Sequence, residues 1–144
     1  MGIEPKVLMA ATGMWVEKYR PTSIDDIIIS DELKNTFKKF VEDKEFPNLL
    51  LSGSQGTGKT TLAKALCNDL GWDYLILNGS DSAQTGVDAL RTTITRFATS
   101  QDMHNPDAYK VIILDEADYL NMTVQPALRN YIEDFSNNAR FILT

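Results

Sequence analysis

Short runs of apolar residues alternate along the chain with segments in which apolar residues recur every three or four positions. The runs are typical of buried strands, and the helical spacing is typical of amphipathic helices. These patterns predict strands at residues 49–52, 74–77, 111–114 and 140–143, and helices at residues 31–44, 58–70, 86–99 and 124–135. Strands that alternate with helices predict parallel crossovers in an α/β fold, a doubly wound parallel sheet with its ligand at the carboxyl ends of the strands.

Single residues mark the ends of several predicted helices. Ser30 precedes the first helix, and Pro47 is expected to end it. Gly71 stops the helix at 58–70, and Pro126 is tolerated in the last helix because a first turn has no N–H partner to lose. No repeat, low-complexity tract or linker divides the chain, which favours a single domain.

The composition agrees with a globular fold. The chain has 144 residues, of which 43% are hydrophobic and 24% are charged. A net charge of −6 argues against a protein that grips nucleic acid over its whole surface, but it is compatible with a small basic face. Residues 7–14 are too short for a signal peptide, and no apolar run approaches the length of a membrane span. We therefore expect a cytoplasmic protein with no membrane partner.

Cysteine and histidine, the residues most used in redox and metal chemistry, occur once each. Cys67 cannot form an internal disulfide, and its place on a predicted helix favours a buried small apolar residue over a nucleophile. His104 lies in a predicted loop with no second ligand nearby, so no metal role is assigned to it.

A glycine-rich segment directly follows the first predicted strand. It reads Gly53-Ser54-Gln55-Gly56-Thr57-Gly58-Lys59-Thr60, with Thr61 next, and it fits the pattern G-x-x-x-x-G-K-[ST]. The glycines let backbone N–H groups surround phosphate oxygens, and a helix that begins near Gly58 points its positive dipole end at them. Lys59 is then expected to neutralise the β- and γ-phosphates, and the Thr60 hydroxyl to ligate magnesium. A turn with no ligand is the alternative, but four fixed residue types at fixed offsets argue against it.

The predicted strand at residues 111–114 ends in two carboxylates. Asp115 is placed to steer the metal ion, and Glu116 to orient an attacking water. Acidic residues also commonly cap a following helix, so this pair would decide little alone. Its occurrence in one chain with the glycine-rich segment predicts a nucleoside-triphosphate site in which Lys59, Asp115 and Glu116 are the catalytic residues.

Further motifs cover nearly the whole chain from Trp15. They are Trp15-Val16-Glu17-Lys18-Tyr19-Arg20-Pro21, Ile24-Asp25-Asp26-Ile27-Ile28, Asn78-Gly79-Ser80-Asp81, Gly86-Val87-Asp88 with Arg91, Asp115-Glu116-Ala117-Asp118, and Gln125 with Ala127-Leu128-Arg129. Together with the glycine-rich segment, they resemble the small subunits of sliding-clamp loaders, the replication factor C small-subunit family of archaea and eukaryotes.

Some positions depart from the cellular members of that family. Ser54-Gln55 stands where those proteins usually have two prolines, and Ile29-Ser30 stands where a glycine usually follows the aliphatic pair. With residues 65–69 and 78–81, these departures look closer to the clamp-loader ATPase subunit of T-even-type phages. A phage or phage-like source is therefore predicted.

The resemblance implies an AAA+ ATPase that uses ATP and Mg²⁺, with Thr60 and Asp115 at the metal. It implies other clamp-loader subunits, a sliding clamp and primer–template DNA as partners in DNA replication. Residues 15–144 would form the AAA+ domain after an N-terminal extension at residues 1–14.

In the family the chain continues past the position of Thr144 with a residue that senses the γ-phosphate, a further strand, an arginine finger, a helical lid and a collar. The resemblance therefore implies an amino-terminal part of a longer protein, truncated before the last strand. Without the arginine finger, we expect very slow hydrolysis. Without the further strand beside the first one, we expect an exposed apolar edge and a tendency to self-associate.

The resemblance also implies an adenine pocket. Tyr19, Arg20, Pro21 and Ile28 would line the adenine and ribose, which suits a flat base that needs an apolar slot with one polar anchor. From the residues alone, an extended arm fixed by proline is the favoured interpretation of residues 19–21.

A polar face on the helix at residues 86–99 is a candidate DNA contact. Arg91 and Arg96 lie away from the apolar stripe among several threonines, which suits phosphate binding. Thr85 and Gly86 would add N–H groups at the start of that helix. A solvated face without a ligand is the alternative, and the residues alone favour it because two arginines are few. The family's placement of this helix toward DNA makes the two alternatives about equal.

Two other functions share part of the pattern. DEAD-box RNA helicases also carry Asp115-Glu116-Ala117-Asp118, but they need a different phosphate loop and a Ser-Ala-Thr motif, both absent here. Another AAA+ DNA motor, of the branch-migration type, remains an alternative, and binding to a sliding clamp would distinguish it from a clamp-loader subunit. A subunit that keeps the fold without hydrolysis is disfavoured because Lys59, Thr60 and both carboxylates are retained.

Overall fold

The structure, a computed structural model, describes residues 23–53, 58–100 and 107–144. In these residues four strands form one sheet in the order β1-β4-β3-β2, and every pairing is parallel. The strands are β1 (Leu49–Leu50), β2 (Tyr74–Asn78), β3 (Lys110–Asp115) and β4 (Ala139–Leu143). The predicted parallel α/β sheet is confirmed.

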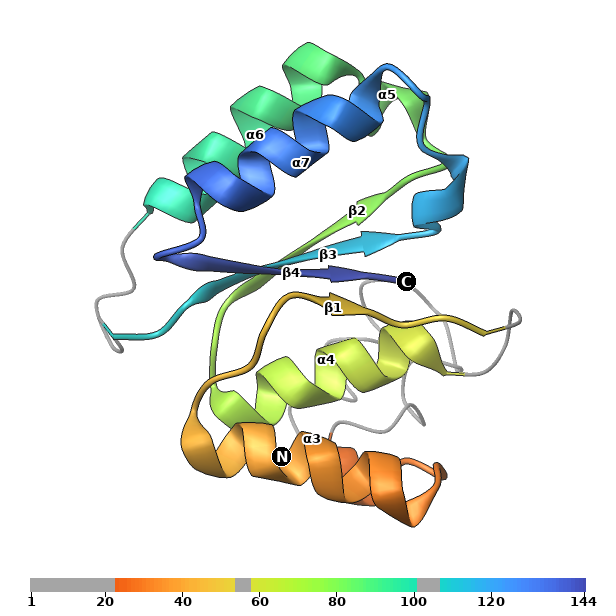
Figure 1. Ribbon diagram of the computed structural model, residues 1–144, viewed down its shortest axis with the longest axis vertical. Helices are drawn as coiled ribbons and strands as arrows, with labels where there is room; N and C mark the ends of the chain where they lie inside the picture. Colours follow the sequence, from red (N-terminus) through yellow and green to blue (C-terminus); the bar gives the residue numbers. More distant parts are fainter. Residues whose placement is uncertain (1–22, 54–57, 101–106) are drawn as a thin grey trace, which may run out of the picture.

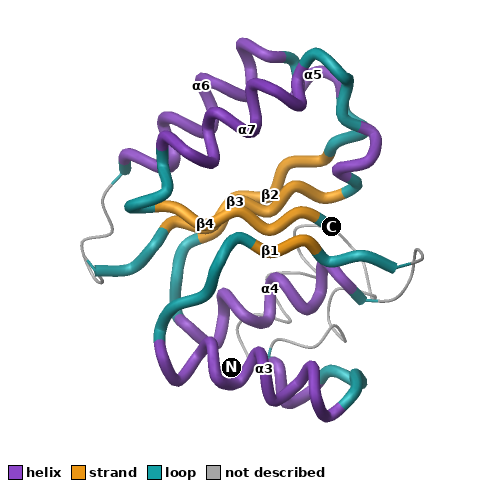
Figure 2. Tube along the Cα trace, in the orientation of Figure 1, coloured by secondary structure: helices purple, strands orange, loops and turns teal. Residues whose placement is uncertain are grey.

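Helices cover both faces of the sheet, which makes it doubly wound as predicted (Figure 1). One face carries α3 (Asp31–Asp43) and α4 (Lys59–Leu70), and the other carries α6 (Val87–Thr99) and α7 (Val124–Asp134). Figure 2 shows the three layers, with the strands between two pairs of helices. Three short elements complete the described chain: α5 (Ser82–Thr85) and the 3₁₀ turns η1 (Ile24–Asp26) and η2 (Ala117–Tyr119).

The central strand β3 explains why an apolar run marks this fold. Val111 and Ile113 pack in the core beneath α3 and α4, whereas Ile112 and Leu114 pack in the core beneath α6 and α7. Successive side chains of a strand point to opposite faces, so a strand covered on both faces must be apolar throughout. Cys67 lies in the first core; its burial raises the thiol pKa to about 12, as suits the predicted structural role.

The predicted helices are confirmed, with small shifts at their ends. Ser30 caps α3, accepting a hydrogen bond from the Leu33 N–H, and the helix ends at Lys44 in a left-handed conformation, before Pro47. Gly58 and Gly71 flank α4, both with positive φ. The helix α5 and the two 3₁₀ turns were not predicted, because elements of three or four residues are too short to show a period.

The first strand differs from the prediction. Residues 49–52 were expected to form a buried strand, but β1 contains only Leu49 and Leu50, and Leu50 is 73% exposed. The reason is its place in the sheet: β1 pairs with β4, and within the described residues no strand lies on its other side. The exposed apolar edge at Leu50 is as predicted, and self-association stays a prediction.

Candidate functional site

The carboxyl end of the sheet borders a cavity of about 930 Å³. It lies between the end of β3, the end of β4, the segment after β1 and the first turn of α4. The predicted site residues in its lining are Gly53, Gly58, Lys59, Thr60, Thr61, Asp115 and Glu116. Residues 54–57 of the glycine-rich segment (Ser54, Gln55, Gly56 and Thr57) lie outside the described residues. The sheet thus brings together both halves of the predicted site, which are about sixty residues apart in sequence.

The start of α4 gives one wall of the cavity a positive character. Gly58 has φ 83 at the N-cap, a conformation that glycine adopts without steric cost. No side chain caps this helix, so the N–H groups of its first turn remain available for an anion together with the helix dipole. The Lys59 ammonium donates a hydrogen bond to the Gly53 carbonyl oxygen at 2.9 Å, which holds the two ends of the glycine-rich segment together.

Oxygen ligands suited to a hard divalent ion lie where the first turn of α4 meets the end of β3. The Thr60 hydroxyl donates to Oδ1 of Asp115 at 2.8 Å, so the predicted metal ligands from α4 and β3 are in contact. A hydroxyl and a carboxylate beside a phosphate site are the protein ligands that Mg²⁺ usually takes, the rest coming from phosphate and water. Among the described residues, no group of three or more His, Cys, Asp or Glu side chains gathers in a way that could hold a metal ion.

Glu116 adopts a rare backbone conformation. Its φ of 53 and ψ of 47 place a non-glycine residue in the left-handed region, at a cost of the order of 1 kcal/mol. The Tyr119 N–H donates to the Glu116 carbonyl at 3.0 Å, and the Gly79 N–H donates to the Asp115 carbonyl at 2.7 Å. A Cβ atom on Gly79 would overlap the Glu116 carbonyl oxygen, so the close approach of β2 depends on glycine. The turn therefore directs the chain sharply away from β3 beside the cavity.

Sequence reasoning missed several residues of this lining. Lys64 follows Thr60 by four positions on α4, so helical spacing could have placed it on the same face. Gln125 belongs to a motif that was noted without a role, and it lines the cavity from α7. Thr144 also lines it, but no local pattern indicates this, because the contact depends on β4 lying next to β3.

The predicted adenine pocket is only partly visible. Tyr19, Arg20 and Pro21 lie outside the described residues. Ile28 is fully exposed, and it is not among the residues that line the cavity. The described residues therefore do not bring Ile28 to the phosphate side of the site, and the adenine pocket stays a prediction.

The predicted DNA face is exposed, with one correction. Arg91 and Arg96 are exposed on α6, and Gly86 is the N-cap of that helix. Thr85 is buried instead: its hydroxyl and its N–H both donate to the Asp81 carbonyl, at 2.9 and 3.1 Å. The prediction that Thr85 offers groups to a phosphate was wrong because residues 82–85 form α5, and this helix uses those donors.

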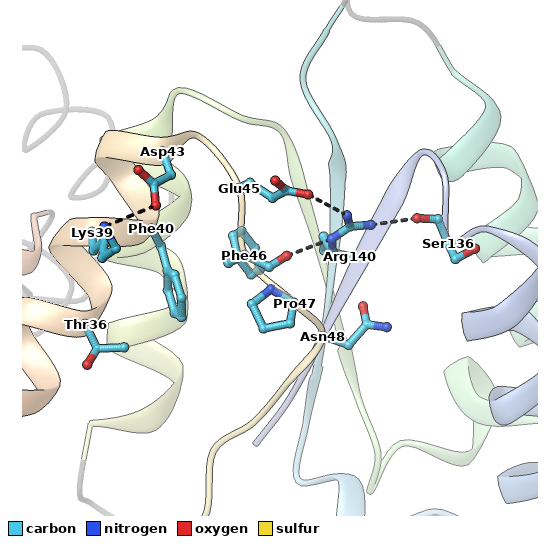
Figure 3. A pocket seen from close by; sticks show the side chains of 10 residues that line it. All are labelled: Thr36, Lys39, Phe40, Asp43, Glu45, Phe46, Pro47, Asn48, Ser136 and Arg140. Atoms are coloured by element: carbon cyan, nitrogen blue, oxygen red, sulfur yellow. Dashed lines mark hydrogen bonds and ion pairs between the residues drawn. The ribbon is translucent and has the colours of Figure 1, made fainter.

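A second cavity, of about 670 Å³, lies at the amino end of the sheet (Figure 3). Arg140 crosses it and is fully engaged by protein groups: it donates to the carbonyls of Phe46 and Ser136, both at 2.7 Å, and lies 3.7 Å from Glu45. Its guanidinium also stacks on the Tyr109 ring at 3.9 Å. These contacts join the segment before β1 to β4, so this cavity has a structural role.

Comparisons with known proteins agree with the geometry. Replication factor C small subunits from Sulfurisphaera tokodaii and Thermofilum pendens are 42% and 44% identical to the chain, over 99% and 90% of its length. The chain spans about two fifths of these relatives, 42% and 41% respectively. The predicted likeness to a phage subunit stays a prediction.

The fold has solved counterparts. The chain superposes on the RuvB Holliday junction branch migration motor of Thermotoga maritima with a TM-score of 0.62 and 26% identity, over 86% of this chain and 40% of that one. A T158V form of the same protein gives a TM-score of 0.64 at 25% identity, over 86% and 40% of the two chains.

Within the described part of the chain, none of the helices is long and apolar enough to cross a membrane.

A family model described as "ATPase family associated with various cellular activities (AAA)" matches residues 49–144, which contain all four strands and the whole described lining of the cavity. The chain therefore belongs to the AAA family of ATPases.

Proposed function

We propose that the cavity at the carboxyl end of the sheet binds ATP with Mg²⁺, and that the chain is the ATPase domain of a sliding-clamp loader small subunit. The observation that carries the proposal is the 2.8 Å contact between Thr60 and Asp115 beside an uncapped helix N-terminus. That arrangement offers positive charge to phosphates and oxygen ligands to a metal within one cavity.

Each group of the cavity has a chemical part in this proposal. Lys59 and the N–H groups at the start of α4 bind the β- and γ-phosphate oxygens, while Thr60 and Asp115 hold Mg²⁺. The metal, when bound, neutralises phosphate charge. Glu116 orients the attacking water and accepts its proton. On nucleotide binding, Lys59 exchanges its hydrogen bond to the Gly53 carbonyl for one to a phosphate oxygen.

The remaining sites follow from the family and stay part of the proposal. Gly53 through Thr61 form the phosphate loop, and residues 19–21 with Ile28 form the adenine pocket. The AAA+ domain begins at residue 15, after a short extension. Gly86, Arg91 and Arg96 contact primer–template DNA, which the exposure of α6 permits.

The clamp-loader assignment is favoured over the branch-migration alternative by sequence likeness. The replication factor C small subunits reach 42–44% identity, whereas the solved RuvB structures reach 26%. Other clamp-loader subunits and a sliding clamp are the partners that this assignment entails.

Nucleotide titration followed by calorimetry tests the site. The chain is expected to bind a non-hydrolysable ATP analogue with Mg²⁺, and Lys59→Ala is expected to weaken that binding. Lys39→Ala at the opposite end of the sheet is the matched control, since it also removes one lysine. Equal affinity of all three proteins would contradict the proposal.

Two binding partners separate the two candidate functions. The chain is titrated with a ring-shaped sliding clamp and, separately, with a four-way DNA junction, each in the presence of Mg²⁺ and the analogue. Binding to the clamp supports the clamp-loader assignment, and binding to the junction alone would favour a branch-migration motor.

The DNA contact is tested by salt dependence. Replacement of Arg91 and Arg96 by alanine is expected to flatten the slope of log affinity for primer–template DNA against log salt by about 2, because each phosphate contact contributes about one unit. An unchanged slope would refute this contact.

A further inference from the structure

Thr144 makes three hydrogen bonds to the segment that carries the two carboxylates. Its N–H donates to the Leu114 carbonyl at 2.9 Å, and its carbonyl accepts from the Ala117 N–H at 3.1 Å. Its hydroxyl donates to Oδ1 of Asp115 at 2.8 Å. Only 9% of the residue is exposed. The end of β4 therefore holds the end of β3 through both main chain and side chain.

The Thr144 hydroxyl donates to a carboxylate oxygen that already accepts a hydrogen bond from a second hydroxyl. Oδ1 of Asp115 accepts from Thr60 and from Thr144, each at 2.8 Å. These two hydroxyls come from different elements, the first turn of α4 and the end of β4. A carboxylate oxygen held from two directions cannot rotate away without breaking a charge-assisted hydrogen bond. The second oxygen, Oδ2, is then fixed in direction as well.

A main-chain hydrogen bond of Thr144 lies next to Glu116, the other carboxylate of the predicted catalytic pair. Ala117 follows Glu116, whose backbone is left-handed, and the Ala117 N–H is bonded to the Thr144 carbonyl. A rare conformation persists only where surrounding structure determines it. Thr144 thus holds the position of the Asp115 carboxylate and the turn at Glu116 together.

We propose that Thr144 is a positioning residue for Mg²⁺ binding: its hydroxyl holds the Asp115 carboxylate in the orientation that receives the metal. The inference rests on the proposed function, since it concerns the same site. The residue does not touch the metal; it acts through the carboxylate, as groups that hydrogen-bond a metal ligand generally do.

A hydrogen bond that only stabilises the fold would leave metal affinity unchanged once the protein is folded. Metal affinity therefore distinguishes a positioning role from a structural role. Mn²⁺ is titrated into the chain at saturating non-hydrolysable ATP analogue, and bound metal is followed by electron paramagnetic resonance. Nucleotide affinity is measured separately in EDTA, and the free energy of unfolding is measured in urea. Thr144→Val removes the hydroxyl at nearly constant volume, and Thr144→Ser keeps it. Thr144→Ala is a second variant without the hydroxyl, for use if the valine protein does not fold.

We expect Thr144→Val to weaken Mn²⁺ binding about tenfold, the lower end of the range for groups that orient metal ligands. Metal-free nucleotide affinity should stay within about twofold, and Thr144→Ser should restore metal affinity. Unchanged Mn²⁺ affinity in Thr144→Val or Thr144→Ala would overturn the inference, as would equal losses with and without metal. If the unaltered chain bound no Mn²⁺ with the analogue, the proposed function itself would fail.

Discussion

The two ends of the sheet both hold charged side chains around a cavity, but among the described residues only those at the amino end are paired with other protein groups of opposite charge. At the amino end, Arg140 is surrounded by carbonyl oxygens and lies near Glu45, and Lys39 pairs with Asp43 at 3.7 Å. At the carboxyl end, within the described part of the chain, neither Lys59 nor either carboxylate forms an ion pair. The amino end pairs its charges within the fold, whereas the proposed function uses those of the carboxyl end to bind a ligand.

The comparison distinguishes charged residues that stabilise the fold from charged residues that bind a ligand. Burying a charge is costly unless protein groups compensate it, so charges with a structural role are paired locally. Charges that bind phosphate and metal must lie close to each other without neutralising each other. Changes at the carboxyl end should therefore alter binding or hydrolysis with little effect on stability, and changes at the amino end should do the reverse.

The largest effect is expected from Glu116→Gln. A positioned general base contributes about 10² to 10⁴ in rate, so hydrolysis should fall at least about 100-fold while nucleotide affinity stays within about twofold. Phosphate release at saturating ATP measures the first quantity, and calorimetry measures the second. Single-turnover conditions separate the hydrolysis step from product release. Hydrolysis that survives the change would remove Glu116 from the mechanism.

Lys59→Ala should act on binding itself. Loss of a charged hydrogen bond corresponds to about 1.5–3 kcal/mol, or about 10- to 150-fold in affinity for the nucleotide. The free energy of unfolding without nucleotide should change by less than about 0.5 kcal/mol, because Lys59 is bonded only to the Gly53 carbonyl in the described residues. A large loss of stability without nucleotide would mean that the two ends of the sheet do not differ in this way.

Arg140→Ala should give the opposite result. Its removal leaves the Phe46 and Ser136 carbonyls without their donor, so the free energy of unfolding should fall by about 1–3 kcal/mol. Arg140→Lys should recover only part of this loss, because an ammonium lacks the planar fork of a guanidinium. Urea denaturation measures both. Nucleotide affinity measured on the folded protein should not change. A loss of affinity in Arg140→Ala would contradict the claim that charges at the amino end only stabilise the fold.

The smallest effect is expected at the exposed pair on α3. Lys39 and Asp43 are 73% and 56% exposed, and exposed helical pairs contribute about 0.3–0.5 kcal/mol. Lys39→Ala should therefore lower stability by less than about 0.5 kcal/mol, with a still smaller change at high salt. A loss of more than about 1 kcal/mol in urea denaturation would mean that the pair belongs to the structural network around Arg140.

The parts of the site that were predictable depend on local spacing. The offsets from Gly53 to Thr60 predict a phosphate loop, and the apolar run before Asp115 predicts the strand that carries this carboxylate. Helix ends at Ser30 and Gly71 were readable because capping uses few residue types. In each case the physical cause lies within a few residues of the signal.

The parts that were missed depend on contacts between distant segments. Thr144 reaches Asp115 only because β4 is inserted between β1 and β3, and Gly79 meets Glu116 only because β2 lies on the other side of β3. The exposure of Leu50 likewise follows from which strand stands at the edge. Thr85 was misplaced because a helix of four residues has no readable period. Strand order carried this information, and local patterns do not encode it.

The most direct test of the account is a crystal structure of the chain soaked with Mg²⁺ and a non-hydrolysable ATP analogue. We predict triphosphate density at the start of α4, with the metal between the Thr60 hydroxyl and the Asp115 carboxylate. Density at the amino end around Arg140, or on any other surface while the carboxyl-end cavity stayed empty, would contradict the account.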